Sequence, residues 1–124
     1  MLGNIIRDAP RIYLLMGRTD FRKQIPGLTA IVTMQFKLDP FTDSCVFIFC
    51  NRRRNAIKVL RYDQNGFILA TKTLMEKMKF QWPMKESDMK EITYQQVEWL
   101  LQGLEIEQKK ALYPVKASPK NSCF

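Results

Sequence analysis

Residues 45–74 of the chain read CVFIFCNRRRNAIKVLRYDQNGFILATKTL. The run Cys45–Cys50 is apolar on both faces of an extended chain, which predicts a buried strand. Asn51–Asn55 is a polar turn, and the strand-like runs Ala56–Tyr62 and Phe67–Leu74 flank the turn signal Asp63-Gln-Asn-Gly66. Because Asn-Gly accepts the positive φ of a tight hairpin, this stretch predicts an antiparallel meander of three strands.

Upstream of the meander, Arg11–Met16 is a further strand-like run, which we expect to join the same sheet as a fourth strand. Pro26 suits the first turn of a helix, where its missing N–H costs nothing. Helical spacing then continues until Asp39-Pro40 stops it, with one apolar face formed by Leu28, Ile31, Val32 and Phe36.

Downstream of the meander, Lys85–Glu91 is predicted to be a charged linker. Thr93 and Gln96 form a capping-box pattern that starts a second helix. Its apolar face consists of Tyr94, Val97, Leu101 and Leu104, with Leu100 beside it. We therefore predict one α+β domain over residues 1–112, a mainly antiparallel sheet of about four strands with two main helices on one face, and a flexible tail over 113–124.

The positive charge of the chain is unevenly distributed. Twenty Lys and Arg residues stand against twelve Asp and Glu residues, a formal net charge of +8. Residues 1–80 hold the whole excess, and residues 81–124 are neutral. A one-sided basic field attracts polyanions, because binding releases counterions from their phosphates. The alternative is a solubilising surface with no ligand.

Cysteine content and hydropathy indicate the cellular compartment in which we expect the protein. Cys45, Cys50 and Cys123 give no regular disulfide framework, which favours a reducing, cytoplasmic environment. In a strand, Cys45 and Cys50 point to opposite faces, so we interpret them as packing or incidental thiols. The longest apolar runs are far shorter than the roughly 20 residues of a membrane-spanning helix.

The strongest basic cluster consists of Arg52, Arg53, Arg54, Lys58 and Arg61, with no acidic residue from 51 through 61. Arginine offers a planar fork to phosphate, and Tyr62, on the same strand face as Lys58, can stack on a base. The structural alternative is a charged turn at a sheet edge. We favour nucleic-acid contact, because turns require Gly, Asn or Asp rather than three arginines.

A second basic cluster is Arg18, Arg22 and Lys23 around Asp20. Asp20 can orient these cations by capping a short turn, which would extend the phosphate-binding surface. Alternatively, Asp20 forms only a surface ion pair with Arg22 or Lys23. The sequence leaves these two interpretations open. Asp63 and Gly66 are assigned structural roles in the hairpin turn.

Enzymatic signatures are weak in this chain. Without histidine, the usual nucleophile–histidine relays and zinc sites lack their parts, and the five glycines form no phosphate loop. A magnesium-dependent nuclease built on the scattered aspartates is a minor alternative. We predict a protein that is not an enzyme and has no cofactor or metal. Trp99, off the main apolar face of its helix, is a candidate partner anchor, with core packing as the alternative.

An ordered set of short motifs resembles a known family, the small TnpB accessory proteins of insertion sequence 66 elements, which share only a name with an RNA-guided nuclease. The motifs are Gly17–Lys23, Gly27-Leu28, Asp39–Phe41, Phe47–Phe49, Asn51–Arg53, Lys58-x-Leu60, Tyr62-Asp63, Gly66-Phe67 and Phe80–Pro83. The resemblance runs from about Arg11 to Tyr113, which is most of the chain, with the motifs in the expected order. Phe21 and Tyr62 depart from the family pattern, where methionine and tryptophan are common.

The resemblance implies a bacterial mobile-element protein that assists DNA transposition by a separate DDE-type transposase, with no established catalytic residues. Two hypotheses follow. In the first, the protein binds DNA, such as the element ends, through its basic surface. In the second, it is a scaffold that binds the transposase or another element-encoded protein without contacting DNA. The oligomeric state is left open.

Overall fold

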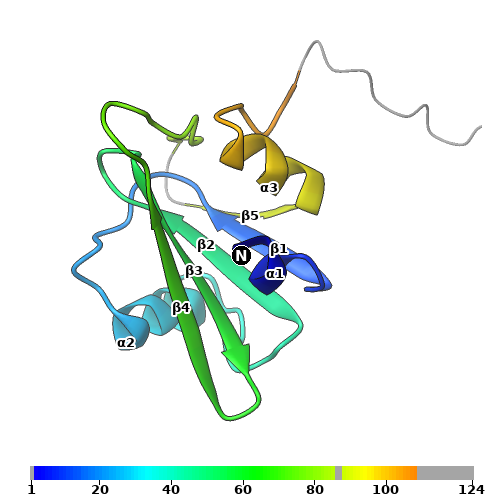
Figure 1. The fold of residues 1–124 in the computed structure, drawn as a ribbon. Helices are drawn as coiled ribbons and strands as arrows, with labels where there is room; N and C mark the ends of the chain where they lie inside the picture. The colour runs from blue at the N-terminus through cyan, green and yellow to red at the C-terminus, as the bar shows by residue number, and fades with distance from the viewer. Residues whose placement is uncertain (1, 86–87, 109–124) are drawn as a thin grey trace, which may run out of the picture.

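The structure is a computed structural model, and it describes residues 2–85 and 88–108. A five-stranded sheet forms its centre, with short helices packed against it (Figure 1). The strands are β1 (Arg11–Leu15), β2 (Cys45–Cys50), β3 (Ala56–Asp63), β4 (Gly66–Thr73) and β5 (Met89–Ile92). The helical elements are α1 (Leu2–Ile6), α2 (Ile25–Ala30), the π-helical turn η1 (Ile31–Gln35) and α3 (Tyr94–Leu101).

The sheet order is β4-β3-β2-β1-β5. The predicted antiparallel meander of β2, β3 and β4 is confirmed, with Cys50 opposite Ile57. The prediction of a four-stranded antiparallel sheet is wrong in two respects: β1 pairs with β2 in parallel, and β5 adds a fifth strand beside β1. The parallel pairing arises because α2 and η1 cross over between β1 and β2, which returns the chain in the same direction.

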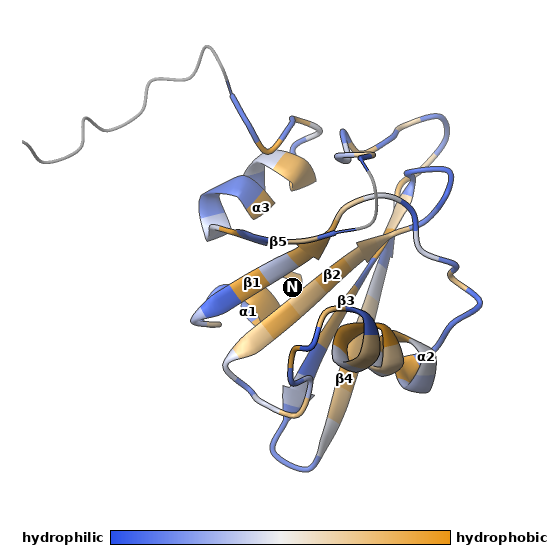
Figure 2. Cartoon of the chain, turned by 180° about the vertical axis from the view of Figure 1, so that it is seen from behind, coloured by the Kyte–Doolittle hydropathy of each residue, from blue (hydrophilic) through white to orange (hydrophobic). Residues whose placement is uncertain are grey.

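Helices cover both faces of the sheet, which corrects the prediction of a single covered face (Figures 1 and 2). On one face, Ile6 of α1 and Val97 of α3 pack with alternate strand residues such as Ile48. On the other face, Leu28 and Val32 pack against the remaining strand side chains. Burial on both sides explains why β2 is continuously apolar, as its hydrophobic colouring in Figure 2 shows.

The segment predicted as a charged linker contains β5, with Met89 opposite Leu15 and Ile92 opposite Ile12. Its four residues are too few, and too charged, to produce a strand signal. Just before this segment, Trp82 lies in the core, where its indole N–H donates to the carbonyl of Leu15 at 3.0 Å. β5 therefore closes the side of β1 that β2 leaves open.

The two predicted helices are present. Pro26 lies in the first turn of α2, and Leu28 and Val32 are fully buried. The capping box is formed as predicted, since the Thr93 hydroxyl accepts from the Gln96 N–H at 3.2 Å. α3 ends at Leu101, so Leu104, predicted on its apolar face, lies beyond the helix and is exposed.

The turn between β3 and β4 differs in detail from the prediction. Asp63 pairs with Gly66, which leaves Gln64 and Asn65 as the two loop residues. The positive φ of 56° falls on Gln64, not on the Asn65–Gly66 pair. The predicted turn at 63–66 is confirmed, and only the expected position of the positive φ is wrong, because the register places Gly66 in the ladder itself.

The described cysteines pack on opposite faces of β2, as predicted. Burial raises the pKa of the Cys50 thiol to about 12 and also raises the pKa of Cys45. Within residues 2–85 and 88–108, no helix has the length and apolar character to cross a bilayer. Cys123 and the predicted tail over 113–124 lie outside the described residues.

Candidate nucleic-acid interface

The turn between β2 and β3, residues 51–55, is organised by its two asparagines. The Asn51 side-chain carbonyl accepts from the backbone N–H groups of Asn55 and Ala56, both at 3.1 Å. The Asn51 amide also donates to the Asn55 side chain at 2.7 Å. These bonds hold the turn without using arginine side chains. Arg52 and Arg53 are therefore left exposed at its tip.

Arg54 has a different position in this turn. Its φ is +60°, a left-handed conformation that favours Gly or Asn. Its carbonyl accepts from the Phe80 N–H at 2.7 Å, and the residue is half-buried. The backbone of Arg54 thus connects the turn to the segment after β4.

The loop at 17–23 lies against the end of β2, because the Thr19 N–H donates to the Cys50 carbonyl at 2.8 Å. Within the loop, Asp20 accepts from the Arg22 backbone N–H at 3.0 Å and forms a 2.8 Å ion pair with the Arg22 guanidinium. These bonds lower the pKa of Asp20 to about 2, and the side-chain bond from Arg22 is the main cause. Both sequence interpretations of Asp20, turn organiser and ion-pair partner, are present in the structure.

An open groove of about 880 Å³ separates the 17–23 loop from the arginine turn. It brings together cations from both clusters predicted from the sequence. Its lining consists of Arg18, Thr19, Asp20, Phe21, Arg22, Asn51, Arg52 and Arg53. Lys23 is exposed nearby without lining the groove.

A third loop, residues 74–80, completes this end of the molecule. The Leu74 N–H donates to the Asn55 carbonyl at 2.7 Å, and the Phe80 N–H donates to Arg54. The loop adds Lys77 and Lys79, both exposed. The sequence analysis missed these two lysines. Their position in the sequence could have indicated this location. They follow the last strand of the meander, and the end of β4 pairs with the start of β3, next to the arginine turn.

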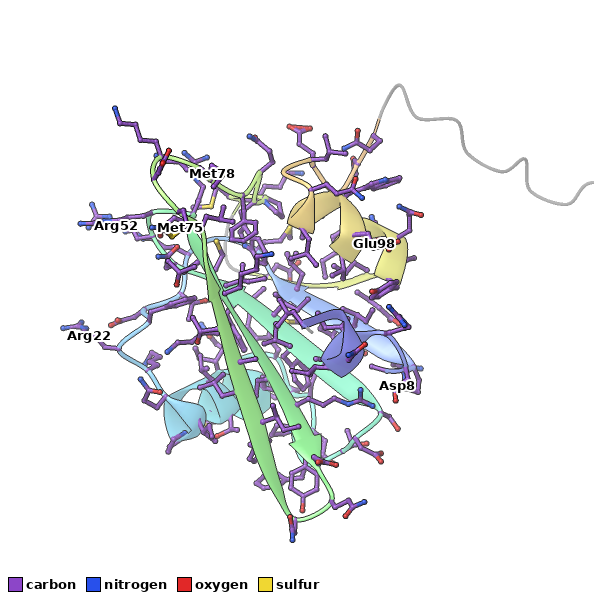
Figure 3. The ribbon with its side chains drawn as sticks, in the orientation of Figure 1. Asp8, Arg22, Arg52, Met75, Met78 and Glu98 are labelled. Atoms are coloured by element: carbon purple, nitrogen blue, oxygen red, sulfur yellow. The ribbon has the colours of Figure 1, made fainter. Side chains whose placement is uncertain are left out.

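We call loops 17–23, 51–55 and 74–80 together the basic end. They contain eight basic and two acidic side chains. Figure 3 shows Arg22 and Arg52 projecting outward on the same side of the molecule, while Asp8 lies at the opposite side. The 51–55 and 74–80 loops are hydrogen-bonded to each other, and the 17–23 loop is hydrogen-bonded to Cys50 at the end of β2, so their charges are held in one place.

Lys58 is not part of this exposed surface. Only 6% of the residue is exposed, and its ammonium donates to the carbonyls of Phe21 and Lys23 at 3.0 and 3.1 Å. The same ammonium lies 4.9 Å from the centroid of the Phe21 ring. The structure thus corrects the placement expected from sequence: Lys58 supports the 17–23 loop from inside, and its charge does not face a ligand.

Arg61 is also engaged within the fold. Its guanidinium donates to the carbonyl of Asp43 at 2.7 Å, to the carbonyl of Ile5 at 2.7 Å and to the carboxylate of Asp8 at 2.6 Å. Its side chain is only 14% exposed. Arg61 therefore joins α1 and the segment before β2 to the sheet, away from the basic end.

Tyr62 and the β3–β4 turn lie at the other end of the sheet. Tyr62 contacts the rings of Phe41 and Phe67, with centroids 5.7 and 5.2 Å apart, in an aromatic group remote from the arginines. The length of β3 separates the two ends by roughly 20 Å, at about 3.3 Å per residue. Asp63 and Gly66 form the last pair of that hairpin. Trp99 is half-buried on α3, and its partner-binding role stays a prediction.

Metal chemistry has no assembled site in the region that the structure covers. Among residues 2–85 and 88–108, no group of three His, Cys, Asp or Glu side chains gathers to hold an ion. The absence of catalysis itself stays a prediction.

The fold and its charges define a small basic α+β protein whose exposed cations gather at one end of a mixed sheet. Residues 10–111 match the model of the family described as IS66 Orf2-like protein, TnpB_IS66. The chain therefore belongs to this family of insertion-sequence accessory proteins, which confirms the resemblance inferred from its ordered motifs.

Two relatives come from Sinorhizobium fredii (strain NBRC 101917 / NGR234). The uncharacterized protein y4hO is 34% identical over 95 residues, which cover 77% of this chain and 81% of the relative. The uncharacterized protein y4jC is 28% identical over 111 residues, which cover 87% and 93% of the two chains. No solved structure matches the chain significantly.

Proposed function

We propose that the protein assists transposition of an insertion sequence by binding DNA phosphates through its basic end, beside a separate DDE-type transposase. The observation that carries the proposal is that three loops, fixed at one end of the sheet by backbone hydrogen bonds, contain eight basic and only two acidic side chains. Such a concentration of fixed positive charge favours the phosphate backbone, because binding releases its condensed counterions. Membership of an insertion-sequence family supports DNA as the polyanion.

The exposed members of the basic end are the candidates for direct contact. Arg52 and Arg53 occupy the tip of a turn that asparagine side chains already stabilise, so their guanidinium groups are free of a role in the turn. Arg18 faces them across the groove. Lys58 and Arg61, whose donors are used by backbone carbonyls, are excluded from the contact set.

The test is a salt titration of the affinity for a fluorescently labelled duplex, measured by anisotropy. If about four cations neutralise phosphates, log affinity falls with log salt with a slope of about −3.6, which is about a 150-fold loss between 50 and 200 mM. The double variant Arg52→Gln/Arg53→Gln is expected to bring the slope to about −1.8.

The matched control is Arg7→Gln/Lys37→Asn, which also removes two charges but changes residues outside the three loops. Asn suits position 37 because Lys37 has a φ of +58°. The control is expected to keep a slope within about one unit of the unchanged protein. Equal slopes for the two double variants would show that net charge alone, and not the position of the charges, determines DNA affinity. No binding at low salt would overturn the proposal.

A second candidate function is contact with another element-encoded protein. Met75 is 72% exposed and Met78 is 55% exposed, both in the 74–80 loop of the basic end (Figure 3). Exposed methionines are typical of adaptable protein-binding surfaces. In a pull-down with the transposase of the same element, Met75→Gln/Met78→Gln should reduce recovery, whereas Met34→Gln, at another exposed methionine, should not. Equal recovery of the three proteins would count against this candidate.

A further inference from the structure

We propose that the groove between the 17–23 loop and the arginine turn binds an unpaired DNA strand, with a base stacked on the ring of Phe21. The inference rests on the proposed DNA contact and names the form of DNA that the site accepts. The proposed site depends on Phe21, which lies beside the arginines only in the folded structure.

The groove has the size and the composition for a strand. Its volume of about 880 Å³ falls within the range of sites that enclose small molecules, roughly 300–1,000 Å³. Arg18 and Arg22 line one wall, and Arg52 and Arg53 line the other. A backbone lying in the groove would therefore meet guanidinium groups from both sides.

Phe21 is the one aromatic residue among the described residues that line this groove. The residue is half-buried: its side chain packs against the core cluster on the α2 face of the sheet, and part of the residue is accessible. Its carbonyl accepts from the Lys58 ammonium at 3.0 Å, and the same ammonium lies 4.9 Å from its ring centroid. Both contacts come from a buried side chain in the centre of β3, so the ring is positioned before any ligand arrives.

A single strand uses this arrangement better than a duplex does. In a duplex, each base is stacked between its neighbours, and a surface loop meets mainly phosphates. An unpaired strand presents the flat face of its bases, and cations combined with an aromatic ring are the usual elements of single-strand sites. The Phe21 ring among four arginines is such a combination.

Asp20 is the one acidic side chain among the described residues of the lining, and its charge is locally compensated. Its carboxylate accepts from Nε and Nη2 of Arg22 at distances of 2.8 to 3.1 Å. Arg22 is thereby partly occupied, so Arg18, Arg52 and Arg53 are left as the main phosphate contacts.

The experiment compares one labelled 20-nucleotide strand with its duplex, using the full chain and the variant Phe21→Leu. The variant is expected to bind the single strand at least about five-fold more weakly, as for loss of one base–aromatic stack. Its affinity for the duplex should change less than two-fold. Phe21→Tyr keeps the ring and should retain single-strand affinity. Phe67→Leu, a half-buried aromatic at the other end of the sheet, should match the unchanged protein.

Ultraviolet cross-linking of the bound single strand should label the peptide that contains Phe21. Unchanged single-strand affinity in folded Phe21→Leu, or a cross-link elsewhere, would overturn the stacking site. In that case, a steep salt slope that depends on Arg52 and Arg53 would leave the proposed DNA contact standing. Failure to bind both forms of DNA at low salt would instead overturn the proposed function and this inference together.

Discussion

The ammonium of Lys58 donates to the carbonyl of Phe21 at 3.0 Å, which ties the centre of β3 to a loop far away in sequence. A second bond, to the carbonyl of Lys23 at 3.1 Å, reaches the other side of the same loop. A buried lysine requires partners for its charge. Here two backbone carbonyls and the Phe21 ring provide them, so the lysine also fixes the position of the 17–23 loop.

Replacing Lys58 should therefore destabilise the fold. Lys58→Met keeps the apolar stem but leaves two carbonyls without their donor, at an expected cost of about 2–3 kcal/mol in the free energy of unfolding. Chemical denaturation measures this change. Lys72→Met, on exposed surface of β4, is the control and should stay within about 0.5 kcal/mol of the unchanged protein. A similar small effect at Lys58 would contradict the bonding described here.

Arg61 and Asp8 should respond very differently to substitution although they form one ion pair. Arg61→Met removes the donors to the Ile5 and Asp43 carbonyls and is expected to cost about 2–4 kcal/mol. Asp8→Asn should leave stability close to that of the unchanged protein, because the carboxylate is 77% exposed and solvent screens the pair. If the two variants lost similar amounts of stability in thermal or chemical unfolding, the ion pair, rather than the carbonyl contacts, would be the main stabilising interaction of Arg61.

Asp20 should titrate unusually low. Its pKa is lowered from 3.8 to about 2, mainly by the Arg22 side chain. The folded pKa lies below the unfolded one, so the stabilising contribution is complete above about pH 4 and is lost as the pH falls toward 2. Carboxyl NMR shifts followed against pH should give this midpoint. In Arg22→Gln, the midpoint should move back toward 3.8, and an unchanged midpoint would rule out Arg22 as the cause.

Arg54 should prove replaceable without loss of stability. Its φ of +60° is unfavourable for a long side chain, and Asn adopts this conformation more readily. Arg54→Asn is expected to raise the free energy of unfolding by about 0.5–1 kcal/mol, because Asn is several-fold enriched in the left-handed region. The same measurement on Arg52→Asn should show no gain, because Arg52 has no positive φ. A destabilised Arg54→Asn would show that the guanidinium supports the turn.

The sequence predicted the parts of the fold that local patterns encode. The meander of β2, β3 and β4, the proline start of α2 and the capping box of Thr93 all have short-range signals. The parallel pairing of β1 had a signal too, a helix between two strands, which favours a crossover. β5 had none, since its four residues form a strand only because β1 offers them an edge.

The sequence predicted most of the charged residues of the candidate region, but not which of their side chains point to solvent. Arg52 and Arg53 occupy an exposed turn, as their pattern indicated. Lys58 and Arg61 bear the same charge, yet carbonyl groups of distant segments take up their donors. Alternation along β3 places Lys58 and Arg61 on opposite faces, but it does not reveal which loops lie above them. Phe21 was noticed only as a departure from the family pattern, since its contact with Lys58 is tertiary.

The position of β1 between β2 and β5 has a consequence for how the chain assembles during synthesis. The hairpins of β2, β3 and β4 need only neighbouring residues, so they can form early. The other edge of β1 is paired only after β5 has been synthesised, because Ile12 pairs with Ile92, which is distant in the sequence. A nascent chain that stops before Met89 therefore keeps an unpaired edge along β1. That edge is a template on which a second copy can add a strand.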